Sequence, residues 1–145
     1  MNMLKRCSIL LILALVLCGC AGLSDWSYDQ LPGDYEIWRV NSQNIVLGQR
    51  DGSTLIHAVD SYIAAFSCNG RFIAVQRLNV DNLEILPGTS IRELGLEPEY
   101  WLIDAWNHAA YGPFTADEYR EQLTLLDIGA LPGWTDTVPA PDGAK

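Results

Sequence analysis

Apolar and polar residues alternate in short runs along the middle of the chain, and turn residues separate the runs. Asp51-Gly52 and Asn69-Gly70 each lie between two such runs. Both dipeptides tolerate positive φ, so each predicts a β-hairpin. The runs cover residues 34–40, 44–49, 53–59, 62–68, 71–77 and 100–106. Because parallel strands would need crossovers of helix length, this spacing predicts an antiparallel β-meander.

The pattern changes after Phe114 from alternation to a helical period. Thr115 is followed three residues later by Glu118, which is the spacing of a capping box. We predict a helix over residues 116–126 with Tyr119 on its apolar stripe. The fold class expected is therefore α+β, with five to seven short strands and one C-terminal amphipathic helix packed on them. The globular domain is predicted over residues 34–130, and residues 131–145 are predicted to be a disordered tail.

Neither face of the first run, residues 34–40, is purely apolar. Tyr35 and Ile37 share one face with Arg39, and Trp38 shares the other with Glu36. Which face of the sheet is buried therefore stays open. The loop expected over residues 80–95 contains Pro-Gly in its middle.

The N-terminus has a different pattern. Lys5 and Arg6 precede an uninterrupted apolar run over residues 9–17. A transmembrane helix needs about 20 apolar residues, so this run is too short to cross a bilayer. A basic start followed by a short apolar run is typical of a signal peptide.

The residues that follow the run are more specific. Leu17-Cys18-Gly19-Cys20 resembles the lipobox of bacterial lipoproteins. The resemblance implies a signal peptide over residues 1–19, cleavage between Gly19 and Cys20, and a diacylglycerol on the Cys20 thiol. Cys18 is the alternative target, but no small residue directly precedes it. Residues 20–33 would then form a lipidated tether.

This resemblance implies a location on a bacterial membrane, facing away from the cytoplasm. In a host with two membranes, the absence of Asp at position 21 resembles lipoproteins that are sorted to the outer membrane, which implies that location. Two or more lipid chains anchor a protein stably where one chain does not.

Charge adds a constraint on partners. The full chain has 18 acidic and 9 basic residues, and removal of Lys5 and Arg6 leaves 7 basic residues and a net charge of −11. Such a domain lacks the basic footprint of a nucleic-acid binder, so we expect no nucleic-acid partner. Anionic headgroups would repel it, so the anchor has to hold it at the membrane.

Candidate catalytic residues are few. His57 and Asp104 are the imidazole and the carboxylate that we consider first, and His108 is placed in a turn. Asp104 is expected to bond to the turn that follows it. The mature chain keeps one unmodified thiol, Cys68, which is expected to be buried or inert. Ligand spacings for zinc and motifs for phosphate or dinucleotide binding are missing from the sequence, so we expect neither a metal nor a cofactor.

Aromatic residues favour a binding role. Trp101 and Trp106 are five residues apart in the last run and would point to opposite faces of the sheet. Together with Tyr111 and Phe114, they form the possible partner surface.

These aromatic residues lie in two segments that resemble known protein families. Residues 101–126 are similar to the strand–turn–strand–helix of GYF-type domains, which bind proline-rich peptides, although Asp127-Ile128-Gly129 replaces the Gly-Tyr-Phe triplet. Residues 31–129 as a whole resemble a family of small bacterial lipoproteins without a characterised function.

Two functional hypotheses follow. The first is a lipid-anchored lipoprotein of the cell envelope without catalytic activity, which binds an envelope protein or peptide at the membrane surface or acts in envelope assembly. The second is a lipid-anchored enzyme that uses Asp104 or His57. The sequence identifies neither the partner nor a substrate.

Overall fold

The computed structural model describes residues 25–145, which form two antiparallel sheets and one α-helix. The predicted signal peptide, including Gly19, and the predicted lipidation site Cys20 lie outside the described residues. The first sheet has the order β1-β2-β3-β4, and the second has the order β8-β7-β6-β5-β9. The strands are β1 (Ser27–Tyr28), β2 (Tyr35–Asn41), β3 (Asn44–Asp51), β4 (Thr54–Val59), β5 (Ile63–Cys68), β6 (Phe72–Leu78), β7 (Pro98–Asp104), β8 (Ala109–Phe114) and β9 (Thr135–Asp136).

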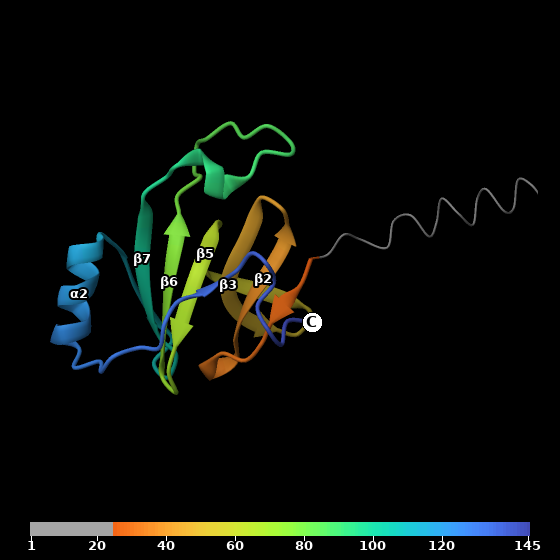
Figure 1. The fold of residues 1–145 in the computed structure, drawn as a ribbon. Coiled ribbons are helices and arrows are strands. Elements are labelled where there is room, and N and C mark those ends of the chain that lie inside the picture. The colour runs from red at the N-terminus through yellow and green to blue at the C-terminus, as the bar shows by residue number, and fades with distance from the viewer. Residues whose placement is uncertain (1–24) are drawn as a thin grey trace, which may run out of the picture.

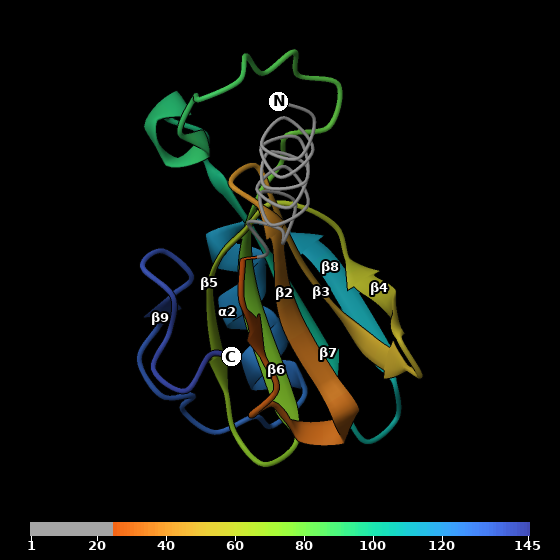
Figure 2. The same cartoon turned by 90° about the vertical axis from the view of Figure 1, so that its right-hand side faces the viewer.

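The two sheets and the helix form three layers, as Figures 1 and 2 show. Helix α2 (Ala116–Leu125) lies against the outer face of the second sheet. The main core fills the space between the sheets and includes Ile37, Leu47, Ile63, Val75 and Ile103. A smaller cluster of Ala74, Leu102, Tyr119 and Ile128 lies under the helix. The predicted α+β class is confirmed, with the strands divided between two sheets.

Both predicted hairpins are present. Asp51 pairs with Thr54 across the first turn, and Cys68 pairs with Ile73 across the second. The predicted capping box is also confirmed, because the Glu118 amide donates to the Thr115 hydroxyl and the Thr115 amide donates to the Glu118 carboxylate. These features depend on residues within one turn, which explains why local sequence predicts them.

The structure shows which face of β2 is buried, a question that the sequence left open. Tyr35 and Ile37 face the second sheet and are buried. Glu36 lies on the other face and is also buried, because Arg50 and Trp38 cover its carboxylate with hydrogen bonds. Short 3₁₀ helices occur at Pro32–Asp34 (η1) and, inside the expected loop, at Ile91–Leu94 (η2).

The described part of the predicted tether, residues 25–33, belongs to the domain. β1 pairs with β2, and Leu31 is buried in the main core. The prediction of a tether up to residue 33 was therefore wrong for these residues. The apolar residues Trp26, Tyr28 and Leu31 are too few to show a period. They pack on the main core, because the backbone of β1 pairs with the edge of β2.

The predicted disorder of residues 131–145 is also corrected. β9 pairs with the edge of β5, and the fully buried Thr137 hydroxyl donates to the carbonyl groups of Ile63 and Ala64. The chain then returns to β1, where the amide of Lys145 donates to the carbonyl of Ser27. Backbone pairing needs no apolar pattern, so composition alone could not reveal it. The ordered domain extends beyond the predicted bounds of 34 and 130 on both sides.

Candidate functional site

The four aromatic residues predicted to form a partner surface divide into a partly buried pair and an exposed pair. Trp101 packs against the main core between the sheets, and Phe114 packs against the cluster under the helix. Trp106 and Tyr111 are the exposed members, and 68% of the Trp106 surface is accessible. The strand ends at Asp104, so Trp106 lies in the turn and does not follow the strand alternation. The predicted surface is therefore reduced to Trp106 and Tyr111.

Asp104 organises that turn. Its carboxylate accepts hydrogen bonds from the backbone amides of Trp106 and Asn107 and from the side-chain amide of Asn107. The carboxylate also receives two hydrogen bonds from the Arg71 guanidinium. The predicted bonding of Asp104 to the following turn is confirmed. With these partners the residue is only 4% exposed.

The same contacts set the ionisation of the group. The hydrogen bond from Arg71 is the largest cause that holds the pKa of Asp104 far below its usual range, and it outweighs the opposing effect of burial. The group therefore stays ionised at neutral pH. A carboxylate with so low a pKa is a poor general base, because it has little affinity for a proton.

Arg71 connects the carboxylate to the aromatic residues. Its guanidinium carbon lies 4.7 Å from the ring centroid of Phe72 and 5.3 Å from that of Trp106. Both distances are within the range of cation–π contacts. The pKa of Arg71 is raised, chiefly by its hydrogen bond to Asp104 and to a smaller degree by Tyr111.

Trp106 is exposed, but its indole ring has two specific contacts. Its indole N–H donates to the carbonyl oxygen of Gly70 at 3.2 Å, and Arg71 contacts the ring. The backbone amide of Ala105 donates to the carbonyl of Arg71, which joins the same two loops. We call the set Trp106, Arg71 and Tyr111 the Trp106 surface.

Sequence reasoning missed Arg71. It follows the Asn69-Gly70 turn directly, and β6 pairs with β7 so that Phe72 lies opposite Asp104. That register places the arginine beside the carboxylate. The hairpin was predictable from local sequence. The pairing of β6 with β7 was not, because a long loop separates these strands and only the tertiary structure brings them together.

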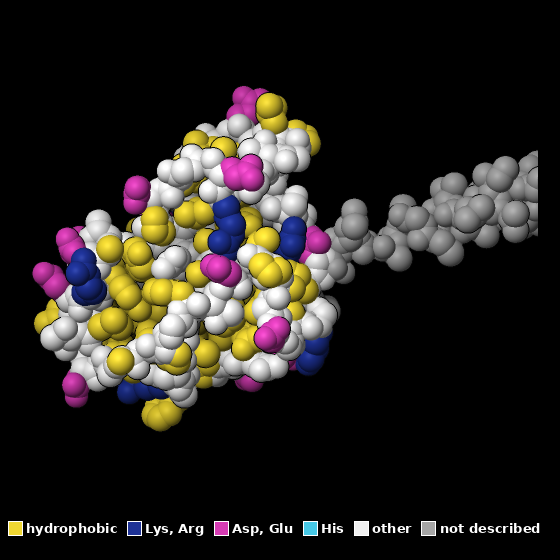
Figure 3. All heavy atoms as spheres, viewed as in Figure 1, with side chains coloured by type: hydrophobic (Ala, Val, Ile, Leu, Met, Phe, Trp, Pro, Cys, Tyr) yellow, Lys and Arg dark blue, Asp and Glu magenta, His cyan; other side chains and the backbone are white. Residues whose placement is uncertain are grey.

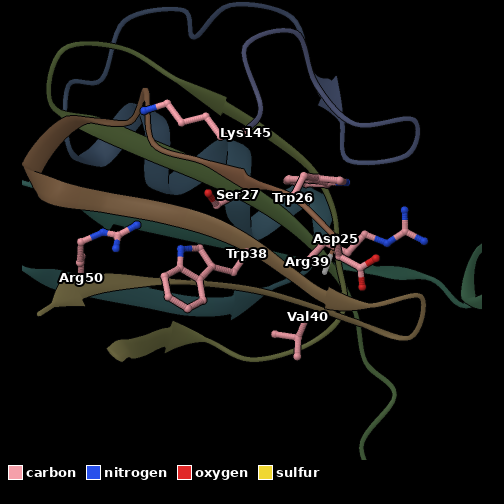
Figure 4. Close-up of a pocket in the computed structure, with 8 residues that line it drawn as sticks. All are labelled: Asp25, Trp26, Ser27, Trp38, Arg39, Val40, Arg50 and Lys145. Carbon is pink, nitrogen blue, oxygen red and sulfur yellow. The ribbon is translucent and has the colours of Figure 1, made fainter. Parts of the chain in front are cut away.

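A cavity of about 460 Å³ opens beside β1 and β2 (Figure 4). Trp38 and Val40 supply apolar surface, and three of its lining side chains are cationic. Two of these cations are paired, Arg50 with Glu36 and Lys145 with Asp29. The residues that line it are Asp25, Trp26, Ser27, Trp38, Arg39, Val40, Arg50 and Lys145.

The other chemical candidates lie apart from one another. His57 is on β4 in the first sheet, where its Nδ1 is 2.9 Å from a carboxylate oxygen of Asp60. Asp104 is at the end of β7 in the second sheet. His108 contacts the Gln49 side chain. No hydrogen bond or ion pair in residues 25–145 joins His57 to Asp104, which is bonded to Arg71 and to its own turn.

The thiol of Cys68 is half-buried against the main core, and burial raises its pKa. Among residues 25–145, no group of three metal-ligating side chains is placed to hold an ion. The same part of the chain contains no helix that is long and apolar enough to cross a membrane.

Comparison with known proteins identifies the family. No curated protein and no solved structure matches the chain. Residues 32–131 match a family described as "Protein of unknown function (DUF3997)", which agrees closely with the range 31–129 expected from the sequence for an uncharacterised family. The match covers more than half of the chain and includes the Asp104–Arg71 pair and helix α2. The chain therefore belongs to DUF3997, a family of unknown function.

Proposed function

We propose that the chain is a lipoprotein of the bacterial envelope, anchored through Cys20, that binds another envelope protein through the Trp106 surface. The single observation that carries the binding role is a mostly exposed tryptophan whose ring has specific contacts with two neighbouring residues. Trp106 is 68% exposed, yet the Gly70 carbonyl and Arg71 fix its ring. Tryptophan is enriched at protein interfaces, because its ring is apolar while its N–H keeps a hydrogen-bond partner.

The composition of the Trp106 surface supports this role. Tryptophan, tyrosine and arginine are the residues most enriched among those that dominate binding energy at protein interfaces. The contacts with Asp104 and Gly70 order these side chains before any partner arrives. Less conformational entropy is then lost on binding, so a surface of this kind binds more tightly than a mobile one.

The proposal assigns no catalytic role to Asp104, because its carboxylate is already bonded to Arg71, Asn107 and the turn amides. The GYF resemblance points to one class of partner, a proline-rich peptide, since Trp106 and Tyr111 lie in the segment that carries it. Such a peptide can be a segment of the envelope protein that binds here.

Photocrosslinking in intact cells tests the binding role. The full chain carries a photoreactive phenylalanine in place of Tyr111, and we expect one discrete crosslinked adduct. Trp106→Ala should abolish the adduct. Leu125→Ala, which removes an exposed apolar side chain from α2, is the matched control and should retain it. An adduct that persists in Trp106→Ala would disprove the role of this surface.

Metabolic labelling with a fatty-acid analogue tests the anchor separately. The full chain should incorporate the label, Cys20→Ser should lose it, and Cys18→Ser should keep it. Incorporation that survives Cys20→Ser would overturn the assignment of the anchor, whatever the crosslinking shows.

A further inference from the structure

A second cavity, of about 240 Å³, lies between the turn after β2, the loop that leads into η2 and the C-terminal segment. Arg39 and Arg92 line it together with the hydroxyl-bearing residues Ser42, Thr89 and Ser90. The side-chain amide of Gln43 donates to the carbonyl of Leu86 and ties two of its walls together. In Figure 3, basic side chains on the visible face lie beneath the loop at the top of the view. The cavity therefore combines cationic and hydroxyl side chains, and a hydrogen bond joins two of the segments that surround it.

Arg39 is exceptional among the cations of this acidic domain. Seven basic side chains occur in residues 25–145, against 18 acidic ones. The other six each form an ion pair with a neighbouring carboxylate, whereas Arg39 forms none within the described part of the chain. Its Nε atom is also buried without a hydrogen-bond partner there. A buried N–H of a cation without an acceptor is unfavourable, so a bound anion would stabilise the site.

Arg92 repeats the feature in the same cavity. Its Nε is buried without a partner among the described residues, while its terminal nitrogens contact the Ala64 carbonyl and, at 3.4 Å, Asp136. None of the residues that line this cavity is acidic. The nitrogens of a guanidinium form a planar fork that matches two oxygens of a phosphate or carboxylate.

We propose that this cavity binds a phosphate-type oxyanion between Arg39 and Arg92, with the hydroxyl groups of Ser42, Thr89 and Ser90 as further donors. The two guanidinium groups come from separate segments and line the same cavity, so one anion between them would accept hydrogen bonds from both. Hydroxyl donors suit the remaining oxygens of a tetrahedral group.

Asp25 is the internal competitor for Arg39. It lies near Arg39 at one end of the neighbouring cavity in Figure 4, and one of its carboxylate oxygens is buried without a hydrogen-bond partner in residues 25–145. The two side chains do not form an ion pair with each other. Replacement of Asp25 by Asn removes this competing charge, so Asp25→Asn should bind an anion at least as tightly as the wild type.

The phosphate can come from two sources, a phospholipid headgroup or a free phosphate ester. The backbone amide of Arg39 donates to the carbonyl of Trp26, and Trp26 follows Cys20 by six residues. Six residues span at most about 20 Å, so headgroups would be within reach of the cavity. This lipid source rests on the anchor proposed above, whereas the binding of free phosphate does not.

Calorimetric titration of inorganic phosphate into the full chain tests the site. The protein is held in nanodiscs of neutral digalactosyldiacylglycerol, whose headgroup contains no phosphate, or in discs that also contain phosphatidylglycerol, at about 150 mM salt to screen the disc charge. In neutral discs we expect the wild type to bind phosphate. Arg39→Gln and Arg92→Gln should each weaken binding at least about tenfold, as expected for a lost charged hydrogen bond.

Arg120→Gln is the matched control, because it removes the same charge from an exposed arginine on α2 that pairs with Asp117. It should bind phosphate as the wild type does. If Arg92→Gln fails to fold, Arg39→Gln decides alone, because its guanidinium has no ion pair to lose among residues 25–145. A wild type that binds no phosphate in neutral discs, or an Arg39→Gln that binds as tightly as Arg120→Gln, would overturn the proposal.

The second disc composition separates the sources. Loss of phosphate binding in discs with phosphatidylglycerol, restored in neutral discs, supports occupation by a headgroup. Equal binding in both discs supports the site with a free phosphate ester as its ligand. Neither readout depends on Trp106 or on fatty-acid labelling, so the anion site and the proposed partner surface can fail independently.

Discussion

Arg71 and Asp104 form a bidentate ion pair, in which Nε of Arg71 lies 3.0 Å from Oδ1 of Asp104 and Nη2 donates to Oδ2. The pair joins the start of β6 to the end of β7, and the same guanidinium contacts the ring of Trp106. A buried carboxylate here both stabilises the fold and orders the proposed binding surface. The contributions to folding and to binding can therefore be separated only by comparing a variant of the ion pair, Asp104→Asn, with a variant of the exposed surface, Trp106→Ala.

Asp104→Asn should destabilise the domain by about 2 kcal/mol, since the net contribution of a hydrogen bond to a charged group is about 1.5–3 kcal/mol. The variant replaces a buried carboxylate that accepts hydrogen bonds from Arg71, Asn107 and the amide of Trp106. Urea unfolding of the full chain measures the free energy of unfolding. A change no larger than that of an ordinary surface substitution, about 0.5 kcal/mol, would show that the ion pair contributes little.

The stabilisation by Asp104 should disappear in acid. Its pKa in the folded protein lies below the value of about 3.9 in an unfolded chain, so its contribution is complete above that pH and is lost as the pH falls toward the folded pKa. The difference in unfolding free energy between the wild type and Asp104→Asn should therefore shrink as the pH falls from about 5 toward 2. Glu36 and Glu118 also have lowered pKa values. Both proteins contain these groups, so their contributions cancel in the difference between the two unfolding free energies.

Trp106→Ala should leave stability nearly unchanged. The ring is mostly exposed, and surface substitutions usually change the unfolding free energy by less than about 0.5 kcal/mol. The loss of its hydrogen bond to Gly70 raises that limit to about 1 kcal/mol. Thermal unfolding of the same full chain used for crosslinking provides the check. A loss clearly above that limit would mean that a missing adduct reports misfolding.

Gly33→Ala should destabilise the domain by about 2 kcal/mol or more, because a left-handed backbone alone costs a residue with a side chain of order 1–3 kcal/mol. Gly33 has a φ of 68°, and a Cβ there would lie 2.5 Å from the carbonyl oxygen of Ala105. Both the backbone and the contact with a rigid carbonyl disfavour alanine.

Gly70→Ala is the control for Gly33→Ala, because a Cβ at position 70 meets no atom within 4 Å. It should stay within about 0.5 kcal/mol of the wild type, the usual range for a surface substitution. Equal midpoints of urea unfolding for the two variants would contradict the close approach of η1 to the turn after β7.

Thr137→Val should cost about 1–2 kcal/mol even though the two side chains have nearly the same shape, because it removes the hydroxyl that donates to the buried carbonyl of Ile63. The carbonyl of Ala64 keeps the Thr137 amide and Arg92 as donors. The Thr137 hydroxyl is fully buried and donates to the carbonyl groups of Ile63 and Ala64, where β5 departs from regular pairing. Thr135→Val changes an exposed threonine of the same segment and serves as the control. Urea unfolding distinguishes the two, and equal stabilities would show that the C-terminal segment is not docked as described.

Local sequence predicted those parts of the fold that short segments determine. The first hairpin follows from Asp51-Gly52, because Gly52 adopts the positive φ that its turn needs. The second follows from Asn69-Gly70, where the Asn69 side chain accepts hydrogen bonds from the amides of Arg71 and Phe72. The start of α2 follows from the reciprocal bonds of Thr115 and Glu118. Residues 25–33 and 131–145 were not predictable in this way. They are held by pairing with strand edges that other segments create.

The candidate site shows the same division. The sequence identified Asp104 as a turn-bonding acid and Trp106 as a candidate binding residue, since both lie in one continuous segment. It could not bring Arg71 or Gly70 beside them, because that contact depends on the pairing of β6 with β7.

The sequence by itself determined the alternation of the strands, the helix with its cap, and the acidic composition of the domain. Only the tertiary structure decided that Trp101 packs on the core while Trp106 is exposed. It also decided that Arg39 lacks an ion pair among so many acids in residues 25–145. The physical reason is that periodicity and capping act over a few residues. Burial and charge pairing depend on which distant segments the sheets bring into contact.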